Sequence, residues 1–143
     1  MPNFKTLSDV VFASEQISLS DIAAAKAAGI TTIINNRPDG EDPSAPQSEA
    51  IEAEALAEGL SYVSIPIGHS GFSEPQIDAM IDALQAAEEG VLAYCRSGTR
   101  STFLWALASA KMGADPDAII GAAMAAGYDV SPVRPMMDML AAR

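Results

Sequence analysis

Short apolar runs rich in β-branched residues alternate along this chain with longer segments of helical composition. The pattern predicts strands at 10–17, 30–35, 60–67 and 91–94, and helices at 19–29, 47–59, 74–90, 100–112, 115–126 and 132–142. Strands that alternate with helices form parallel sheets covered on both faces. We therefore expect an α/β fold with a central, mainly parallel sheet, in a single domain over residues 1–143.

Polar or reactive residues follow three of the expected strands. They are Asn35 to Arg37, the segment from Pro66 to His69, and Cys95. Because ligands bind at the carboxyl ends of parallel strands, we expect these three loops to be neighbours at one edge of the sheet.

The segment YCRSGTRS, residues 94–101, places the only cysteine of the chain between a buried strand and a helix. Free N–H groups and the helix dipole at such a position favour an anion, and Gly98 allows the backbone to curl around it. Arg96 and Arg100 supply two of the eight basic residues of the chain. Cys95 is therefore predicted to be a thiolate nucleophile in an anion-binding loop.

The rest of this loop is assigned to substrate binding. Ser97, Gly98 and Thr99 form its turn, and Ser101 is expected to donate a hydrogen bond to the thiolate or to cap the helix. The alternative is a buried, inert cysteine, the commoner fate of a free thiol. Arginines one and five residues after Cys95 argue against that alternative, because a core cysteine does not need them.

The composition of the chain limits the classes of molecule that it is expected to bind. The formal charge of −11 argues against nucleic acid and anionic membranes, and one cysteine, unable to form an internal disulfide, suits the cytoplasm. One histidine and one cysteine do not supply the usual zinc ligands, and no dinucleotide or Walker motif is present, so we expect no metal and no cofactor. The expected partner is a small anionic substrate; the sequence does not indicate an oligomeric state.

Three segments, INNRPDGE, YVSIPI and VLAYCRSGTRS, resemble the phosphatase-like domain of the beta-lactamase hydrolase-like proteins. The resemblance covers most of the chain, from about residue 5 to about residue 110. It implies a fold like that of a small dual-specificity phosphatase, with Cys95 as the nucleophile. Members of the family are described as phosphatase-like and some are assigned as sulfurtransferases, so the reaction remains open.

The loop departs from the tyrosine-phosphatase pattern, in which five residues separate the cysteine from the arginine. Four residues separate Cys95 from Arg100, a length that resembles rhodaneses, whose loop surrounds a cysteine persulfide. The sequence therefore favours a sulfurtransferase that accepts sulfur from thiosulfate or a persulfide. The alternative is a phosphatase that forms a thiophosphate on Cys95 from a phosphomonoester. A binding module without turnover is the third possibility.

Candidates outside the Cys loop lie on the two other loops. Phosphatases of this kind often carry an acidic aspartate in an Ile-Pro-x-x-Asp segment; the matching stretch here is IPIGH, so His69 is the candidate general acid or substrate hydrogen-bond donor. Arg37 is expected to reach the anion, Asp39 to orient an arginine through a salt bridge, and Asn36 to support the loop. In the alternative interpretation these residues only build turns.

Overall fold

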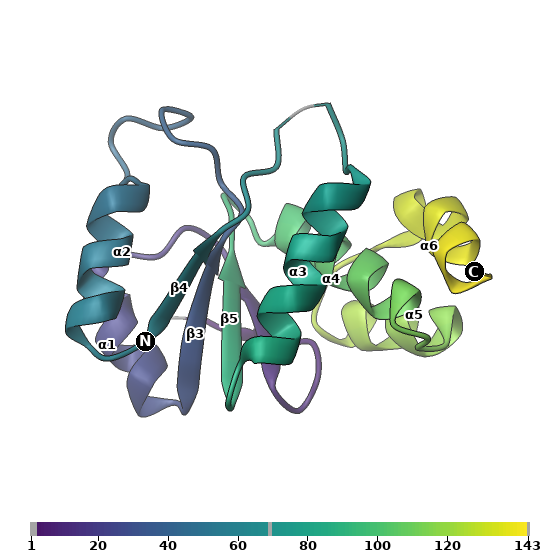
Figure 1. Ribbon diagram of the computed structural model, residues 1–143, viewed down its shortest axis with the longest axis horizontal. Helices are drawn as coiled ribbons and strands as arrows, with labels where there is room; N and C mark the ends of the chain where they lie inside the picture. Colours follow the sequence, from purple (N-terminus) through teal and green to yellow (C-terminus); the bar gives the residue numbers. More distant parts are fainter. Residues whose placement is uncertain (1–2, 69, 143) are drawn as a thin grey trace.

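A five-stranded sheet runs through the middle of the structure, a computed structural model that describes residues 3–68 and 70–142 (Figure 1). The strands are β1 (Lys5–Thr6), β2 (Val11–Ser14), β3 (Ile30–Asn35), β4 (Ser61–Ser64) and β5 (Gly90–Tyr94). The helices are α1 (Leu19–Ala27), α2 (Ser48–Ala57), α3 (Glu74–Ala86), α4 (Thr99–Lys111), α5 (Pro116–Ala125) and α6 (Arg134–Ala141). A 3-10 turn (Ser131–Val133) precedes α6.

The strand order is β1-β2-β5-β3-β4, with β1 antiparallel to β2 and the other neighbouring strands parallel. The four parallel strands thus end at the same edge, which lies at the top in Figure 1. The expected mainly parallel α/β fold is confirmed. The two-residue strand β1 was not predicted, because so short a pairing leaves no periodic pattern in the sequence.

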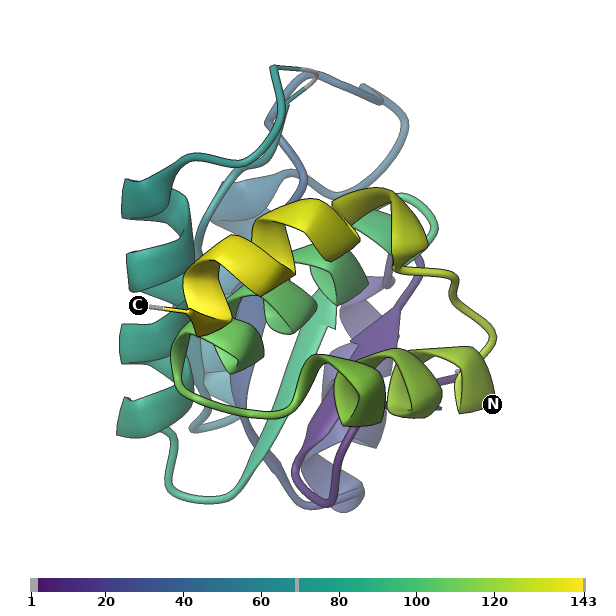
Figure 2. The same ribbon diagram turned by 90° about the vertical axis from the view of Figure 1, so that its right-hand side faces the viewer.

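Helices cover both faces of the sheet. In Figure 1, α1 and α2 lie on one side, α3 and α4 lie on the other, and α5 and α6 form an outer group beyond α4 (Figure 2). The alternation of strand residues explains this: Ile33 and Leu92 enter the core beneath α1 and α2, whereas Ile34 and Ala93 enter the core on the α4 side. Each fully buried isoleucine contributes about 2 kcal/mol by leaving water.

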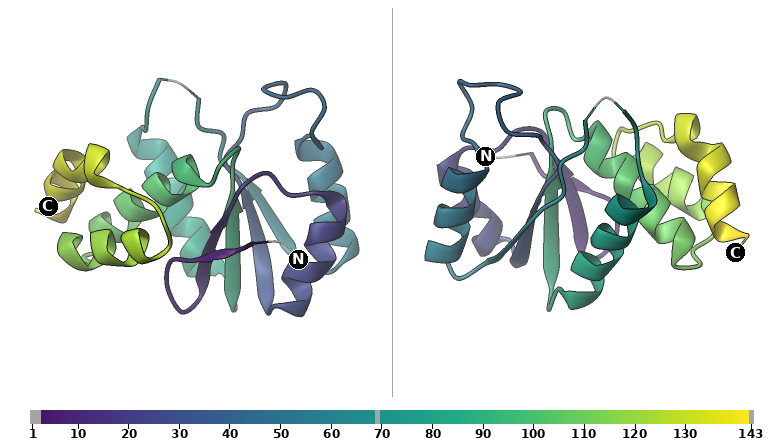
Figure 3. Two further views of the ribbon diagram at one scale, coloured as in Figure 1. Left: turned by 180° about the vertical axis from the view of Figure 1, so that it is seen from behind. Right: turned by 45° about the horizontal axis from the view of Figure 1, so that its top comes forward.

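Backbone hydrogen bonds tie the strand ends together where the loops begin. The N–H of Cys95 donates to Ser14 O at 3.3 Å, and that of Asn36 donates to Tyr94 O at 2.9 Å. The N–H of Ile67 donates to Asn36 O at 3.0 Å, so the loop after β4 continues the pairing beyond the strand. The loops after β3, β4 and β5 therefore start from one rigid edge, as Figure 3 shows from two further directions.

Among the described residues, none of the helices is long and apolar enough to span a bilayer.

Candidate functional site

The Cys loop, residues 95–100, leads from the end of β5 into α4. Cys95 is buried, and its Sγ accepts a hydrogen bond of 3.1 Å from the N–H of Gly98. Gly98 is the N-cap of α4 and has a left-handed conformation, with φ of 92°. Its carbonyl accepts hydrogen bonds from both the N–H and the hydroxyl of Thr102. The loop thus curls so that a backbone donor faces the sulfur, as the sequence predicted.

Tyr128, from the segment between α5 and α6, packs behind this turn. Its hydroxyl donates to Ser97 O at 3.1 Å and lies 2.1 Å from the position that a Cβ on Gly98 would take. Burial raises the pKa of Tyr128, and the negative charge of a Cys95 thiolate raises it further. The sequence analysis missed Tyr128, because nothing local to residues 127–129 indicates contact with a loop some thirty residues earlier.

Cys95 is fully buried, but neither cluster of packed hydrophobic side chains includes it. Its sulfur accepts the Gly98 N–H and lies near the Arg100 guanidinium, two polar groups that an inert core cysteine does not need.

The structure corrects the expectation for Ser101. Its hydroxyl is fully buried, has no hydrogen-bond partner among the described residues, and therefore neither bonds the thiol nor caps the helix. The cap position falls on Gly98 instead, so Ser101 lies inside the first turn of α4.

Arg100 is held by three of its five N–H groups. Its Nη1 donates to Glu41 Oε2 at 2.9 Å and to Ile67 O at 2.8 Å, and its Nη2 donates to Glu41 Oε1 at 2.7 Å. The Nε–H and the second Nη2–H remain, and these two lie on the same side of the guanidinium. They form a second fork, suited to an oxyanion.

The hydrogen bond that Arg100 donates to Glu41 is the main cause that raises the pKa of Arg100, and a Cys95 thiolate also contributes through its charge and by accepting a hydrogen bond. The guanidinium therefore lies beside the sulfur.

Glu41 joins the two arginines of the site. It accepts the Arg100 pair described above, and its Oε1 also accepts from Arg37 Nε at 2.8 Å. The hydrogen bond from Arg100 lowers the pKa of Glu41 from 4.5 to about 2; desolvation opposes this and Arg37 reinforces it. Glu41 is thus a carboxylate at neutral pH. The sequence analysis assigned it no role, although it ends the quoted NRPDGE motif.

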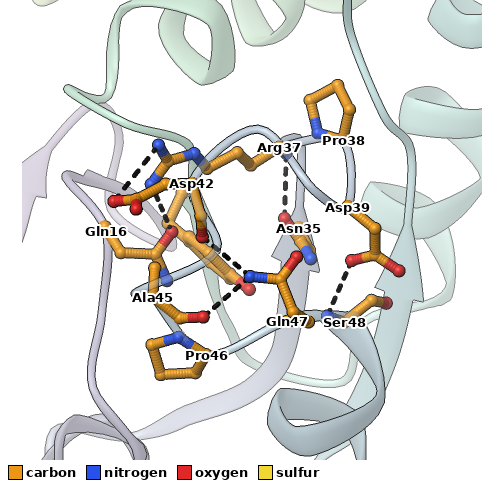
Figure 4. Close-up of a pocket in the computed structure, with 11 residues that line it drawn as sticks. Gln16, Asn35, Arg37, Pro38, Asp39, Asp42, Ala45, Pro46, Gln47 and Ser48 are labelled. Atoms are coloured by element: carbon orange, nitrogen blue, oxygen red, sulfur yellow. Dashed lines mark hydrogen bonds and ion pairs between the residues drawn. The ribbon is translucent and has the colours of Figure 1, made fainter.

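Contrary to the expectation from the sequence, Arg37 does not reach the Cys loop. It is 9% exposed and, besides Glu41, donates from Nη1 to Gln16 Oε1 at 2.9 Å, while its Nη2 lies 3.8 Å from Asp42 Oδ2. Figure 4 shows its guanidinium turned toward Gln16 and Asp42, inside the loop that follows β3. Arg37 therefore holds Glu41 in place rather than offering a free fork to a ligand.

The predictions for Asp39 and Asn36 have different outcomes. The salt bridge predicted for Asp39 is wrong: its Oδ1 accepts the N–H of Ser48 at 2.9 Å, at the start of α2 (Figure 4). Glu41 pairs with the arginines instead. The supporting role of Asn36 fits the geometry, since its Nδ2 donates to Ile65 O at 3.0 Å and fixes the segment after β4.

The remaining candidates lie at the rim or outside the described residues. Arg96 and Ser97 are exposed, and the hydroxyl of Ser97 donates to Thr99 Oγ1 at 3.0 Å. His69 lies outside the described residues. In residues 3–68 and 70–142, no group of three or more histidine, cysteine, aspartate or glutamate side chains is arranged to hold a metal ion.

Comparison with known proteins places this geometry in a family. Residues 3–112 match the family model of the beta-lactamase hydrolase-like protein, phosphatase-like domain. The beta-lactamase hydrolase-like protein of Xylella fastidiosa strain Temecula1 is 42% identical over 79 residues, which are 55% of this chain and 18% of that protein. The chain thus spans about a fifth of the length of this curated relative.

Solved structures share the fold. A candidate phosphatase of Neisseria meningitidis Z2491 superposes with a TM-score of 0.82 and 31% identity, covering 95% of this chain and 96% of the other. TpbA of P. aeruginosa, in complex with pTyr, gives a TM-score of 0.63 at 18% identity, covering 95% and 90%. These neighbours favour the phosphatase alternative over the sulfurtransferase that the loop length suggested. The chain belongs to the family of the beta-lactamase hydrolase-like protein, phosphatase-like domain.

Proposed function

We propose that this domain hydrolyses phosphomonoesters, with Cys95 as the nucleophile and Arg100 as the ligand of the phosphoryl oxygens. One observation carries the proposal: Arg100 lies beside the thiol with one fork fixed by Glu41, and its second fork, Nε–H and Nη2–H, does not bond Glu41. A fork of two parallel N–H groups matches two oxygens of a phosphoryl group.

In the first step, the Cys95 thiolate attacks phosphorus while the bond from phosphorus to the ester oxygen breaks. The phosphoryl group moves to sulfur and the alcohol leaves after taking up one proton. Arg100 and the N–H groups in the first turn of α4, which have no intrahelical acceptor, stabilise the charge on the equatorial oxygens. In the second step, water attacks the same phosphorus, phosphate leaves, and the thiolate is regenerated.

The proton for the leaving oxygen requires an acid that is protonated near neutral pH. Glu41 does not meet this requirement, because its arginine partners hold its pKa at about 2. His69 stays the candidate acid on the grounds of its place after the Ile-Pro segment.

The spacing of four residues between Cys95 and Arg100 is the observation that favours the second candidate, sulfur transfer. In that reaction, the thiolate takes the outer sulfur of thiosulfate, releases sulfite, and becomes a persulfide. The two reactions leave different groups on the same sulfur atom, so the adduct distinguishes them.

The test is a pair of assays on the full chain. Wild type should release phosphate from an aryl phosphate, and an acid-quenched reaction should show by intact mass one phosphoryl group that is absent in Cys95→Ser. Arg100→Lys keeps the charge but loses the fork, and we expect its kcat/KM to fall roughly a hundredfold. Arg134→Lys is the matched control, because Arg134 pairs with Asp117 and Asp138 in the outer helices. A sulfur adduct after thiosulfate treatment, without phosphate release, would overturn the proposal in favour of sulfur transfer.

A further inference from the structure

One peptide unit of the Cys loop makes a hydrogen bond at each end. The carbonyl of Ser97 accepts the Tyr128 hydroxyl at 3.1 Å. The N–H of Gly98 belongs to the same amide group and donates to Cys95 Sγ at 3.1 Å. Because the carbonyl and the N–H of a trans peptide point in opposite directions, the tyrosine hydroxyl and the sulfur lie on opposite sides of this unit. The three groups form a chain of hydrogen bonds that runs from the hydroxyl through the amide to the sulfur.

The two hydrogen bonds of this chain strengthen each other. A hydroxyl that donates to a carbonyl draws electron density toward the oxygen, and the N–H of the same amide becomes a better donor. A better donor favours the thiolate over the neutral thiol, because a hydrogen bond to a charged acceptor is about twice as strong as one to a neutral acceptor. The hydroxyl also fixes the plane of the peptide, so the N–H stays aimed at the sulfur.

The loop carbonyls on either side of this unit have partners of their own. Arg96 O accepts the N–H of Gln16 at 3.2 Å, and Gly98 O accepts the N–H of Thr102 at 2.9 Å. The unit that faces the sulfur is instead held by a side chain 31 positions further along the chain, between α5 and α6. One substitution there therefore tests its contribution and leaves the sequence of the loop unchanged.

We propose that Tyr128 is a positioning residue for the nucleophile, which holds and polarises the peptide between Ser97 and Gly98 so that the sulfur is kept as a thiolate. The inference rests on the proposed function in one respect, that Cys95 is the nucleophile. It does not depend on whether the thiolate attacks phosphorus or sulfur, because the hydroxyl acts on the sulfur before any substrate reacts.

The hydroxyl must keep its proton to act in this way. Burial is the largest cause that raises the pKa of Tyr128, and the charges of a Cys95 thiolate and of Glu15 raise it further, so the hydroxyl is a donor at neutral pH. The charged groups near the sulfur or the hydroxyl are Lys5, Glu15, Arg96 and Arg100. All of them stay in place in the test, so a change in the stability of the thiolate is caused by the loss of the hydroxyl.

The experiment measures alkylation by iodoacetamide across pH, followed by intact mass. The chain has one cysteine, so the adduct reports Cys95, and Cys95→Ser gives the background from other residues. Tyr128→Phe keeps the ring and removes the hydroxyl. We expect the midpoint of its alkylation profile to move upward by roughly 0.3–0.5 pH unit, because the thiolate is less stabilised. The rate well below the midpoint should fall roughly two- to threefold, and the limiting rate at high pH should not fall.

Tyr62→Phe is the matched control. Its hydroxyl accepts Asn35 Nδ2 at 3.1 Å and bonds the Ser48 hydroxyl, and its ring packs against the core beneath α1 and α2, on the other face of the sheet. This variant loses a comparable hydroxyl and so controls for a general loss of stability, which urea unfolding measures for both variants. Its alkylation profile should match that of wild type.

The outcomes separate this inference from the proposed function. A midpoint that moves in Tyr128→Phe but not in Tyr62→Phe supports the role of Tyr128 even if no aryl phosphate is hydrolysed. An unmoved midpoint, or an equal shift in both variants, refutes it even if wild type is an active phosphatase. A lower limiting rate with an unmoved midpoint would show that Tyr128 controls access to the sulfur and would also refute it. With aryl phosphate hydrolysis, the acid limb of kcat/KM should shift by the same amount as the alkylation midpoint.

Discussion

The two loops that build the site are held in different ways. The Cys loop takes its shape from backbone chemistry: the left-handed Gly98, its N–H on the sulfur, and its carbonyl on Thr102. The loop after β3, residues 36–47, is held by side chains, above all by Glu41, whose carboxylate meets an arginine 59 positions away in the chain. The first loop should therefore fail when its backbone is changed, and the second when a charge is removed.

The largest effect is expected from Gly98→Ala. The new Cβ would lie 2.1 Å from the Tyr128 hydroxyl and 3.3 Å from Ser14 O, and an alanine at a φ of 92° is strained. We expect about 2–4 kcal/mol less stability and at least a tenfold loss of kcat/KM, because the N–H that faces the sulfur must move. Urea unfolding and aryl phosphate kinetics measure the two effects.

Gly113→Ala is the matched control for this substitution. Gly113 also has a positive φ, 103°, but nothing lies within 4 Å of its added Cβ. It should lose only the strain energy, about 1 kcal/mol, with kinetics unchanged. If Gly98→Ala is as mild as Gly113→Ala, the Cys loop does not depend on the close approach of Tyr128.

Glu41→Gln is expected to have the next largest effect. An amide of the same shape removes the charge that both Arg37 and Arg100 pair with, so the guanidinium beside Cys95 loses its fixed orientation. We expect kcat/KM for an aryl phosphate to fall roughly tenfold to a hundredfold, mostly in kcat, while the chain stays folded.

Asp42→Asn provides the comparison for Glu41→Gln. Asp42 lies 3.8 Å from Arg37 and makes no ion pair with Arg100 in the described residues, so its loss should change kcat/KM less than twofold. Faster turnover in Glu41→Gln would show the opposite of our interpretation: Glu41 would then block the arginine instead of positioning it.

Acid should weaken the loop after β3 through the same carboxylate. The folded-state pKa of Glu41, about 2, lies below its ordinary value of 4.5, so its stabilisation is complete above pH 4.5 and is lost as the pH falls toward 2. The difference in unfolding free energy between wild type and Glu41→Gln should be constant above pH 4.5, at about 2 kcal/mol, and shrink below it. A difference independent of pH over this range would mean that Glu41 does not form these pairs in solution.

The same contrast explains what could be predicted from the sequence. Strand β3 was predicted at its observed limits, Ile30–Asn35, and the Cys loop was predicted with its glycine turn, because both follow from patterns within a few adjacent residues. Strand β1 was missed because its two residues form a strand only by pairing with β2.

The hydrogen-bond and ion-pair partners of individual side chains could not be predicted from the sequence. The NRPDGE motif offers two carboxylates to two arginines, Arg37 within the motif and Arg100 in the Cys loop, and nothing local decides between Asp39 and Glu41. The folded loop decides it: Asp39 accepts the N–H of Ser48, the first residue of α2, whereas Glu41, two residues on, pairs with Arg100 of the Cys loop. Tyr128 was missed for the same reason, since its contact with Ser97 joins residues 31 positions apart.

Asp39→Ala should have the smallest effect, and it tests directly whether Asp39 stabilises α2 while Glu41 holds the arginines. Asp39 serves α2 as a cap, because the N-cap residue Gln47 makes no capping hydrogen bond with its own side chain. Its loss should cost about 1 kcal/mol of stability and leave kcat/KM within twofold of wild type. Asp115→Ala is the control, since Asp115 is the N-cap of α5 and makes no side-chain cap bond, so it should cost less. A loss of activity in Asp39→Ala equal to that of Glu41→Gln would indicate that Asp39 pairs with an arginine, as the sequence analysis predicted.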